Sequence, residues 1–293
     1  MTIAVFGRLV NAKNTAAVRR LYERAEQHNI SVRLFKPLAE QIIPQCNELG
    51  NCEAFLNFTE LMQDVTALFS IGGDGTLLNT VELVKNSNIP VVGINTGRLG
   101  FLANFSVDQI EEALQLIISK QYTEDHRTLL EVSSNKPLFG ENNFALNEFT
   151  LQKTTPSAVI KVQAYVNGEF LSSYWADGVI VSTPTGSTGY SMSANGPIVL
   201  PQSNSFVLTP IAPHNLNLRP IVLPDSSEIS FQVSEHRGEC YCTLDSNSWS
   251  VDSSYTFTVK KADFTINIIR PKENTFMDTL RNKLMWGLDN RNK

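Results

Sequence analysis

The 293-residue sequence has few of the features that mark membrane, secreted or metal-clustered proteins. No apolar run approaches the roughly 20 residues that a transmembrane helix needs. The N-terminus lacks the basic start and long apolar core of a signal peptide, so we expect a cytoplasmic protein with no membrane partner. The four cysteines and four histidines match no metal-ligand spacing, and a reducing compartment would leave the cysteines as thiols.

Two catalytic motifs and one charge pattern are also missing. There is no Gly-x-Ser-x-Gly elbow for a serine nucleophile, and the lack of a Gly-x-x-x-x-Gly-Lys-Ser/Thr loop excludes a P-loop. The formal net charge of -5 provides no general nucleic-acid surface, so we expect no nucleic-acid partner. Any anionic ligand must therefore be held locally by helix ends, backbone amides, single basic residues or a metal.

The sequence does contain a glycine turn between a predicted strand and a predicted helix. The apolar run at residues 65–71 is typical of a buried parallel strand, and Gly72-Gly73-Asp74-Gly75-Thr76 follows it directly. Glycines permit unusual backbone angles, and the unpaired N–H groups of a helix start favour phosphate. Asp74 would repel that phosphate, which indicates another role: accepting a proton from a hydroxyl nucleophile or holding a divalent cation. Alternatively, it caps the helix.

Strands and helices alternate over the first hundred or so residues. The expected strands span residues 3–6, 31–35, 65–71 and 89–94. One expected helix begins at residue 14, with Asn14 or Thr15 as its N-cap, and a second begins at residue 76. A third spans residues 107–119, and the poorly patterned residues 37–64 are also interpreted as helical. This alternation predicts an α/β domain at residues 1–121, with a doubly wound, mostly parallel sheet that binds ligands beyond the carboxyl ends of its strands.

Short strand candidates without intervening helices follow from about residue 122. They span residues 129–133, 144–151, 159–166, 179–182, 206–211, 228–233, 240–244, 255–259 and 264–269. This pattern predicts an all-β, sandwich-like domain at residues 122–272. Phe276, Met277, Leu280 and Leu284 then predict a C-terminal helix within residues 273–293, stopped by Gly287 and packed back on the first domain.

Two further polar stretches suit a nucleotide. The glycine-rich loop at residues 93–102 carries Arg98, which could complement a phosphate, and Phe101, which could face a base. A βα loop with a packed Phe is the alternative. The adjacent amide and carboxylate of Asn147-Glu148 suit the hydroxyls of a sugar, although an edge strand with its polar residues toward water would look the same.

The longest stretch spans residues 177–197, where an apolar strand feeds a loop dense in glycine and hydroxyl side chains. Small hydroxyls and exposed amides can read the edge of a purine or a carboxamide, and Tyr190 can stack on a ring. A plain Ser/Thr-rich connector is the alternative. The extent and density of the pattern favour a binding loop.

These stretches occur in the order and spacing of one known family. The glycine turn alone is shared with diacylglycerol and sphingosine kinases and, in a related form, with phosphofructokinases. The Asn147-Glu148 pair and residues 177–197 narrow the resemblance to the NAD kinases, with further similarity at residues 209–214, at Arg219-Pro220 and at residues 283–287. The chain therefore resembles an NAD kinase from about residue 71 to its C-terminus.

The resemblance implies phosphoryl transfer from ATP to the 2′-hydroxyl of the adenosine ribose of NAD, giving NADP, assisted by a divalent metal, Mg²⁺ or Mn²⁺. It implies that Asp74 takes the hydroxyl proton and that Gly72, Gly73, Gly75 and Thr76 bind phosphate. It also implies a homodimer or homotetramer whose β-rich domains contribute to neighbouring sites. The residues expected to bind the dinucleotide are Phe101, Asn147, Glu148, Trp175, Asp177, Thr188, Gly189, Tyr190, Ser191, Met192, Ser193, Ala212 and Asn247.

Two of these positions differ from the family's pattern. Many relatives have Asp-Gly-Gln where this chain has Asp245-Ser246-Asn247, and Asn247 is one methylene shorter than Gln. Trp175 stands where some relatives have Arg, so the resemblance does not imply a phosphate contact from it. Two other functions remain open: a lipid kinase that shares the glycine turn, and a nucleotide-sensing protein without turnover. The sequence lacks the membrane-binding amphipathic helix or basic patch that a lipid kinase would need.

Overall fold

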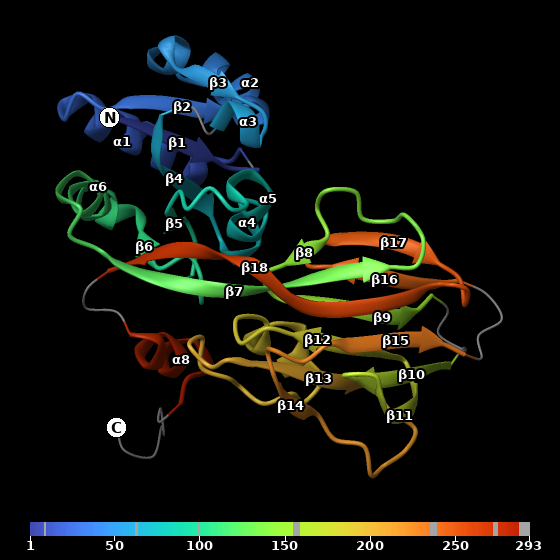
Figure 1. Cartoon of the computed structure of the whole chain (residues 1–293). Helices are drawn as coiled ribbons and strands as arrows, with labels where there is room; N and C mark the ends of the chain where they lie inside the picture. The colour runs from blue at the N-terminus through green and yellow to red at the C-terminus, as the bar shows by residue number, and fades with distance from the viewer. Residues whose placement is uncertain are drawn as a thin grey trace. The chain divides into compact units, whose positions relative to one another are not determined.

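The computed structural model describes residues 1–8, 10–61, 64–98, 100–154, 159–234, 239–271 and 275–286. The chain divides into two compact units (Figure 1). The first unit consists of Met1–His126 and Ile266–Lys293, and the second of Arg127–Thr265. The predicted fold class is confirmed, since a mixed α/β unit and an antiparallel β unit are both present, together with a C-terminal helix.

The first unit is built around a parallel sheet. Its five main strands are β1 (Thr2–Phe6), β2 (Ser31–Phe35), β3 (Glu53–Phe55), β4 (Val65–Gly72) and β5 (Val91–Asn95). They lie in the order β5-β4-β1-β2-β3, and every neighbouring pair is parallel. The last six residues of β4 are buried, as expected of a strand covered on both faces.

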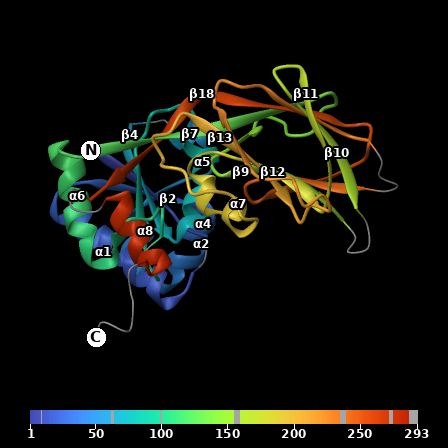
Figure 2. The same cartoon turned by 90° about the horizontal axis from the view of Figure 1, so that it is seen from below.

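Helices cover both faces of this sheet (Figures 1 and 2). On one face lie α1 (Ala12–Gln27) and α6 (Ile110–Ser119), whose apolar residues form one core with β1, β4 and β5. On the other lie α4 (Asp74–Leu78) and α5 (Val81–Val84), and Leu77 packs closely over Gly93 of β5. Helices on both faces make the sheet doubly wound, as predicted. The remaining short helices of this part are α2 (Lys36–Ile42) and α3 (Phe58–Leu61).

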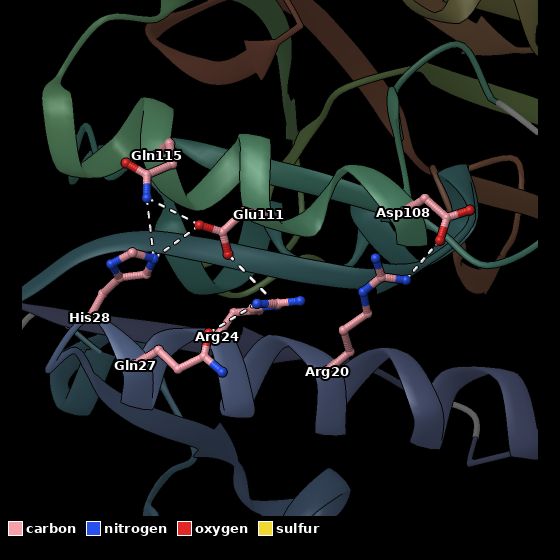
Figure 3. A network of polar contacts seen from close by, with 7 residues as sticks. All are labelled: Arg20, Arg24, Gln27, His28, Asp108, Glu111 and Gln115. Atoms are coloured by element: carbon pink, nitrogen blue, oxygen red, sulfur yellow. Dashed lines mark hydrogen bonds and ion pairs between the residues drawn. The ribbon is translucent and has the colours of Figure 1, made fainter.

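A network of mostly exposed polar side chains links α1 to α6 (Figure 3). Nε2 of His28 lies 3.0 Å from Oε1 of Glu111, and the amide of Gln115 donates to the same oxygen at 3.1 Å. The hydrogen bonds from Gln115 and His28 lower the pKa of Glu111. Nearby, Arg20 donates to Asp108 at 2.7 Å. Because water screens these groups, the apolar contacts between the helices contribute far more to stability than this network does.

Three expectations for the first unit were wrong in detail. The N-cap of α1 is Asn11, whose side chain accepts the N–H of Asn14, while Asn14 itself is buried. The helix after the glycine turn begins at Asp74 and is interrupted before Val81. Residues 37–64 contain the strand β3 as well as short helices, because Phe55 is buried beside Phe35 at the edge of the sheet.

The second unit is antiparallel and contains two sheets. The first has the order β14-β13-β12-β9-β16-β17. Its strands are β9 (Glu148–Lys153), β12 (Gly178–Ser182), β13 (Ser205–Ile211), β14 (Ile221–Pro224), β16 (Cys240–Leu244) and β17 (Asn247–Val251). The second sheet contains β7 (Thr123–Ser134), β8 (Phe144–Ala145), β10 (Ile160–Val166), β11 (Glu169–Ala176), β15 (Ile229–Val233) and β18 (Thr256–Arg270).

The two sheets of this unit enclose a common core. Phe149 of β9 lies 6.0 Å from Phe231 of β15 and 5.4 Å from Phe257 of β18, measured between ring centroids. Cys240 and Cys242 are buried in the same core, and both are free thiols. Facing sheets with an apolar interior form a sandwich, as predicted.

Strand boundaries in the second unit differ from the expectations, most clearly at two places. The predicted strand at residues 144–151 is broken between β8 and β9, and the predicted strands at 255–259 and 264–269 form one 15-residue strand, β18. The exposed pair Lys260 and Lys261 interrupts the apolar pattern of β18 without interrupting its backbone. The end of β18 reaches the first unit, where Ile268 and Ile269 pair with β5; the two-residue strand β6 (Phe105–Ser106) also pairs with β5.

The C-terminal helix α8 (Phe276–Leu284) belongs to the first unit. A capping box between Thr275 and Asp278 starts it, and Met285 ends it with φ of 56°. Phe276 and Leu280 are buried, but Met277 is 45% exposed, so its expected place on the apolar face was wrong. Gly287, the expected stop, lies outside the described residues. Across the described ranges of the chain, none of the helices has the length and apolarity to span a membrane.

Candidate active site

The predicted site residues fall in both units, with the glycine turn in the first. β4 ends at Gly72, which has φ of +154°, and α4 starts at Asp74 with Gly73 as its N-cap. Gly73 and Gly75 are exposed, while Asp74 and Thr76 are half-buried. The turn therefore places accessible backbone and one carboxylate at the carboxyl end of a central parallel strand, where ligands bind in doubly wound sheets.

Three consecutive backbone amides hold the carboxylate of Asp74. Oδ2 accepts from Phe101 at 2.7 Å, and Oδ1 accepts from Leu102 and from Ala103 at 3.0 Å each. No side chain caps α4, so helix capping is not the role of Asp74. A carboxylate oxygen accepts about two hydrogen bonds, so Oδ2 keeps a free acceptor direction in a fixed orientation.

Gly100 makes this grip possible. A Cβ atom at that position would lie 1.8 Å from Oδ1 of Asp74, which is far inside van der Waals contact. The glycine thus lets the loop after β5 wrap the carboxylate. In the same loop Arg98 is exposed and Phe101 is half-buried. The ring centroid of Phe101 lies 6.2 Å from that of Phe276 in α8.

A second group of predicted residues gathers at one end of β9 and β12 in the second unit. Glu148 starts β9 opposite Ser182, the last residue of β12, and the binding loop continues from there. A Cβ atom at Gly186 would lie 2.1 Å from the carbonyl oxygen of Asn147, so this close approach requires glycine. Asn247 lies at the same end, exposed, across the hairpin from Leu244.

The carboxyl group of Glu148 is strongly perturbed. Burial and the nearby charge of Asp245 raise its pKa from 4.5 to about 8, against a hydrogen bond from the backbone N–H of Tyr190, which lowers it. Near neutral pH the group is therefore largely protonated. In that form it can both donate and accept a hydrogen bond, which suits a hydroxyl-rich ligand.

The loop after β12 forms two short helical turns. Gly186–Thr188 is a 3-10 turn, and α7 spans Tyr190–Ser193. Thr188, Gly189, Tyr190 and Met192 are half-buried, and Ser193 is exposed. The side chain of Ser191 is fully buried, with its hydroxyl 2.9 Å from that of Thr209, so only its backbone could meet a ligand.

Three other predicted residues lie near the start of β12, at the end away from Glu148. Asp177 precedes β12 and forms an ion pair with Lys153 at 2.6 Å, while Ala212 follows β13 with φ of 42°. Trp175 of β11 is 47% exposed, with the amine of Lys161 5.1 Å from its ring centroid. The five residues of β12 separate this end from Glu148, roughly 16 Å at about 3.3 Å per residue. One copy of this unit therefore presents two separate groups of predicted residues.

The described residues include no group of three or more His, Cys, Asp or Glu side chains that could hold a metal ion. Mg²⁺ is commonly bound by one or two carboxylates together with substrate phosphates rather than by an all-protein cage. The exposed glycines of the turn, which can receive phosphate, fit that kind of site.

Sequence reasoning missed three residues that shape these groups: Gly100, Gly186 and Asp245. Both glycines lie in stretches that the sequence analysis singles out, and the high glycine content of those stretches is the signal that could have identified them. Asp245 was noted only for its neighbour Asn247, yet its carboxylate accepts hydrogen bonds from the backbone of the Asn147-Glu148 pair.

Two family models match the chain. That of the ATP-NAD kinase N-terminal domain matches residues 10–122, and that of the ATP-NAD kinase C-terminal domain matches residues 146–270. Over 294 residues the chain is 45% identical to the NAD kinase of Flavobacterium psychrophilum, with 100% of both chains covered. Identity to the NAD kinase of Cytophaga hutchinsonii is 44%, with the same coverage.

Two solved structures are also similar. The structure of yeast NADH kinase complexed with NADH gives a TM-score of 0.88 at 25% identity, covering 99% of this chain and 89% of that one. An NAD kinase from Archaeoglobus fulgidus in complex with ATP gives a TM-score of 0.76 at 26% identity, covering 97% and 99% respectively. With both family models matched and full-length relatives above 40% identity, the chain belongs to the ATP-NAD kinase family of enzymes.

Proposed function

We propose that the chain transfers the γ-phosphoryl group of ATP to the 2′-hydroxyl of the adenosine ribose of NAD, with Asp74 as general base. The observation that carries this proposal is the fixed carboxylate of Asp74, gripped by three amides with an acceptor direction left over. The hydroxyl oxygen bonds to the γ-phosphorus while its proton passes to Oδ2. The bond from that phosphorus to the β–γ bridging oxygen breaks, and ADP leaves with the bond's electron pair.

The base accounts for only part of the rate. General-base assistance contributes roughly 10²–10⁴-fold. The rest must come from positioning and from stabilising charge on the transferring phosphoryl group. We assign the phosphate to the exposed turn, whose binding residues are Gly72, Gly73, Gly75 and Thr76.

The dinucleotide is assigned to the second unit and to Phe101. Asn147 and protonated Glu148 suit a ribose, because each can donate and accept hydrogen bonds. Tyr190 and Phe101 offer half-buried rings for the bases. The other residues assigned to NAD are Trp175, Asp177, Thr188, Gly189, Ser191, Met192, Ser193, Ala212 and Asn247.

A divalent cation, Mg²⁺ or Mn²⁺, is expected to accompany ATP. The one acceptor direction left on the Asp74 carboxylate is assigned to the hydroxyl proton, so the ion would be held mainly by the nucleotide phosphates and water. When bound, the ion neutralises charge that develops on the phosphoryl oxygens.

We further infer that the active form is a homodimer or homotetramer. The two groups of NAD-binding residues lie at opposite ends of β12, roughly 16 Å apart. This separation supports an assembly in which Asp177 and Ala212 of one copy serve the site of a neighbouring copy.

The activity is tested by incubating the purified chain with ATP, Mg²⁺ and either NAD or NADH, and following NADP or NADPH with a coupled dehydrogenase. Asp74→Asn should lower kcat at least about 10²-fold with the Kd for NAD within a few-fold of wild type. Asp108→Asn is the matched control, because that carboxylate is 89% exposed and pairs with Arg20 on the surface. Equal turnover by Asp74→Asn and wild type would remove the base from the proposal, and no product from wild type would remove the reaction.

The shared site is tested by complementation. Asp74→Asn and Asp177→Ala chains carrying different tags are co-expressed and the mixed assembly is purified. If residues of two copies build each site, some mixed sites contain neither substitution, and kcat/KM at low NAD exceeds that of either variant alone. Activity equal to the average of the two separate variants would contradict sharing.

A further inference from the structure

The break between β8 and β9 has an unusual backbone arrangement. In an extended strand, successive N–H groups point to alternate sides. Here three consecutive N–H groups, those of Leu146, Asn147 and Glu148, converge on one carboxylate, that of Asp245. The segment therefore curls around an anion instead of continuing the predicted strand.

The distances are those of ordinary charge-assisted hydrogen bonds. Oδ2 of Asp245 accepts from Leu146 at 2.8 Å, and Oδ1 accepts from Asn147 at 2.8 Å and from Glu148 at 3.0 Å. The N–H of Asp245 donates in return to the carbonyl of Glu148 at 3.1 Å. The contact is thus reciprocal and involves backbone groups throughout the segment.

The position of Asp245 in the chain favours this contact. It lies in the hairpin turn between β16 and β17 and has φ of 49°, in the left-handed region that Asp tolerates better than most residues. The pairing of Leu244 with Phe149 brings the turn beside the start of β9. The side chain therefore reaches residues about 100 positions earlier in the sequence, at separations of 97 to 99.

The opposite side of the segment is also held. Thr183 donates its hydroxyl to the carbonyl of Leu146 at 2.6 Å and its N–H to the carbonyl of Asn147 at 2.9 Å. The Asn147 and Glu148 amides point to Asp245, and the carbonyls of Leu146 and Asn147 point to Thr183. This leaves the side chains of Asn147 and Glu148 as the groups that the segment can present to a ligand.

We propose that Asp245 is a positioning residue for NAD: its carboxylate folds residues 146–148 so that Asn147 and Glu148 present their side chains together. This role rests on the proposed function, in which that pair binds the ribose. Asp245 acts through the backbone and does not contact NAD. A second consequence is electrostatic: besides burial, the charge of the Asp245 carboxylate raises the pKa of Glu148, while the Tyr190 N–H lowers it.

The test compares Asp245→Asn with wild type in NAD binding, by calorimetry without ATP. The amide keeps the size of the side chain but replaces one acceptor oxygen with a donor, so at least one of the three amides loses its partner. We expect the Kd for NAD to rise roughly 10- to 100-fold, because removing a charge-assisted bond and leaving a donor unpaired weakens the arrangement. In turnover, KM for NAD should rise by a similar factor with kcat within about threefold.

The pKa of Glu148 is a second measurement, and it distinguishes the loss of the Asp245 charge from a general loss of packing. With ¹³C-labelled glutamate, carboxyl NMR should show the pKa of Glu148 falling in Asp245→Asn, because a neighbouring negative charge is removed. Asp252→Asn is the matched control: the Asp252 carboxylate also accepts a backbone N–H, from Ser254 at 2.8 Å, in an exposed turn. It should change neither the Kd nor the titration.

Three outcomes separate the possibilities. If Asp245→Asn binds NAD as tightly as wild type and Glu148 titrates unchanged, the positioning role is overturned. If wild type binds NAD but forms no NADP, the reaction is overturned while the comparison of Kd values stands. If Asp245→Asn does not fold, amide exchange in wild type decides: slow exchange at all of Leu146, Asn147 and Glu148 supports the role, and solvent-rate exchange at any of them overturns it.

Discussion

The backbone N–H of Phe101 donates to Oδ2 of Asp74 at 2.7 Å, across 27 positions of sequence. This bond and its two neighbours join the end of β4 to the loop after β5, so the proposed base and a proposed ring contact for NAD are positioned by one interaction. The orientation of the carboxylate therefore depends on the path of the loop's backbone.

Gly100→Ala should disable the site although Asp74 itself is not substituted. The new Cβ would lie 1.8 Å from Oδ1 of Asp74, so either the carboxylate or the loop must move. We expect kcat to fall roughly 10²-fold, since small misplacements of a reacting group have effects of that size. Gly97→Ala is the control, because the nearest atom to its Cβ would be 3.7 Å away. Steady-state kinetics of the two variants check this, and equal kcat values would contradict it.

Ser191→Ala should affect stability more than catalysis. The hydroxyl is buried against that of Thr209, and its removal leaves Thr209 without this partner, at a cost of about 1–3 kcal/mol in the free energy of unfolding. Ser193→Ala, at an exposed position two residues on, should leave stability within about 0.5 kcal/mol. Denaturant unfolding measures both. A larger loss for Ser193→Ala would reverse the assignment.

Glu148 should make the protein less stable as pH rises. Its pKa is raised from 4.5 to about 8, so the folded state holds a proton that the unfolded state has released between these values. The stabilisation of the folded state by this bound proton is fully present below about pH 4.5 and is lost by about pH 8. Its size is on the order of a few kcal/mol in the free energy of unfolding. In Glu148→Gln this part of the pH dependence should disappear. Denaturant midpoints at several pH values test it, and parallel curves for the two proteins would contradict it.

The polar network between α1 and α6 should contribute little. Glu111→Gln removes the acceptor shared by Gln115 and His28. Both of these partners are exposed and Glu111 is only half-buried, so we expect a loss below about 1 kcal/mol in the free energy of unfolding. The pKa of Glu111 is lower in the folded than in the unfolded protein. Its contribution to the free energy of unfolding is therefore present above the unfolded-state pKa and is lost as the pH falls through the folded-state pKa. A loss above about 2 kcal/mol in thermal unfolding would show that the network acts cooperatively.

Much of the fold could be predicted from local patterns. The almost unbroken apolar run of β4 indicates a strand buried on both faces, and the helical spacing of Val18, Leu21 and Ala25 in α1 indicates a helix buried on one face. The structure confirms the burial of both. The pattern fails where burial is weak. β17, with the sequence Asn-Ser-Trp-Ser-Val, lies at the edge of its sheet with mostly exposed side chains, so nothing in its composition marks it as a strand.

The residues of the candidate site were easier to find than their partners. Asp74 stands out as the one carboxylate in a glycine turn, and Asn147 and Glu148 because polar residues interrupt an apolar run. Their hydrogen-bond partners could not be predicted, because those of Asp74 are backbone amides 27 to 29 positions away, and every residue except proline has such an amide. Asp245 was unpredictable for the same reason, since its carboxylate binds backbone rather than a recognisable side chain.

The division of the first unit into two sequence segments has a consequence for folding during synthesis. Residues 127–265 form the second unit as one continuous stretch, whereas β5 gains Ile268 and Ile269 as neighbours only after that stretch has been translated. On the ribosome, the second unit can therefore complete its core first, while residues 1–126 await their last strand and α8. The middle stretch of the chain can thus reach its final packing before the residues that precede it.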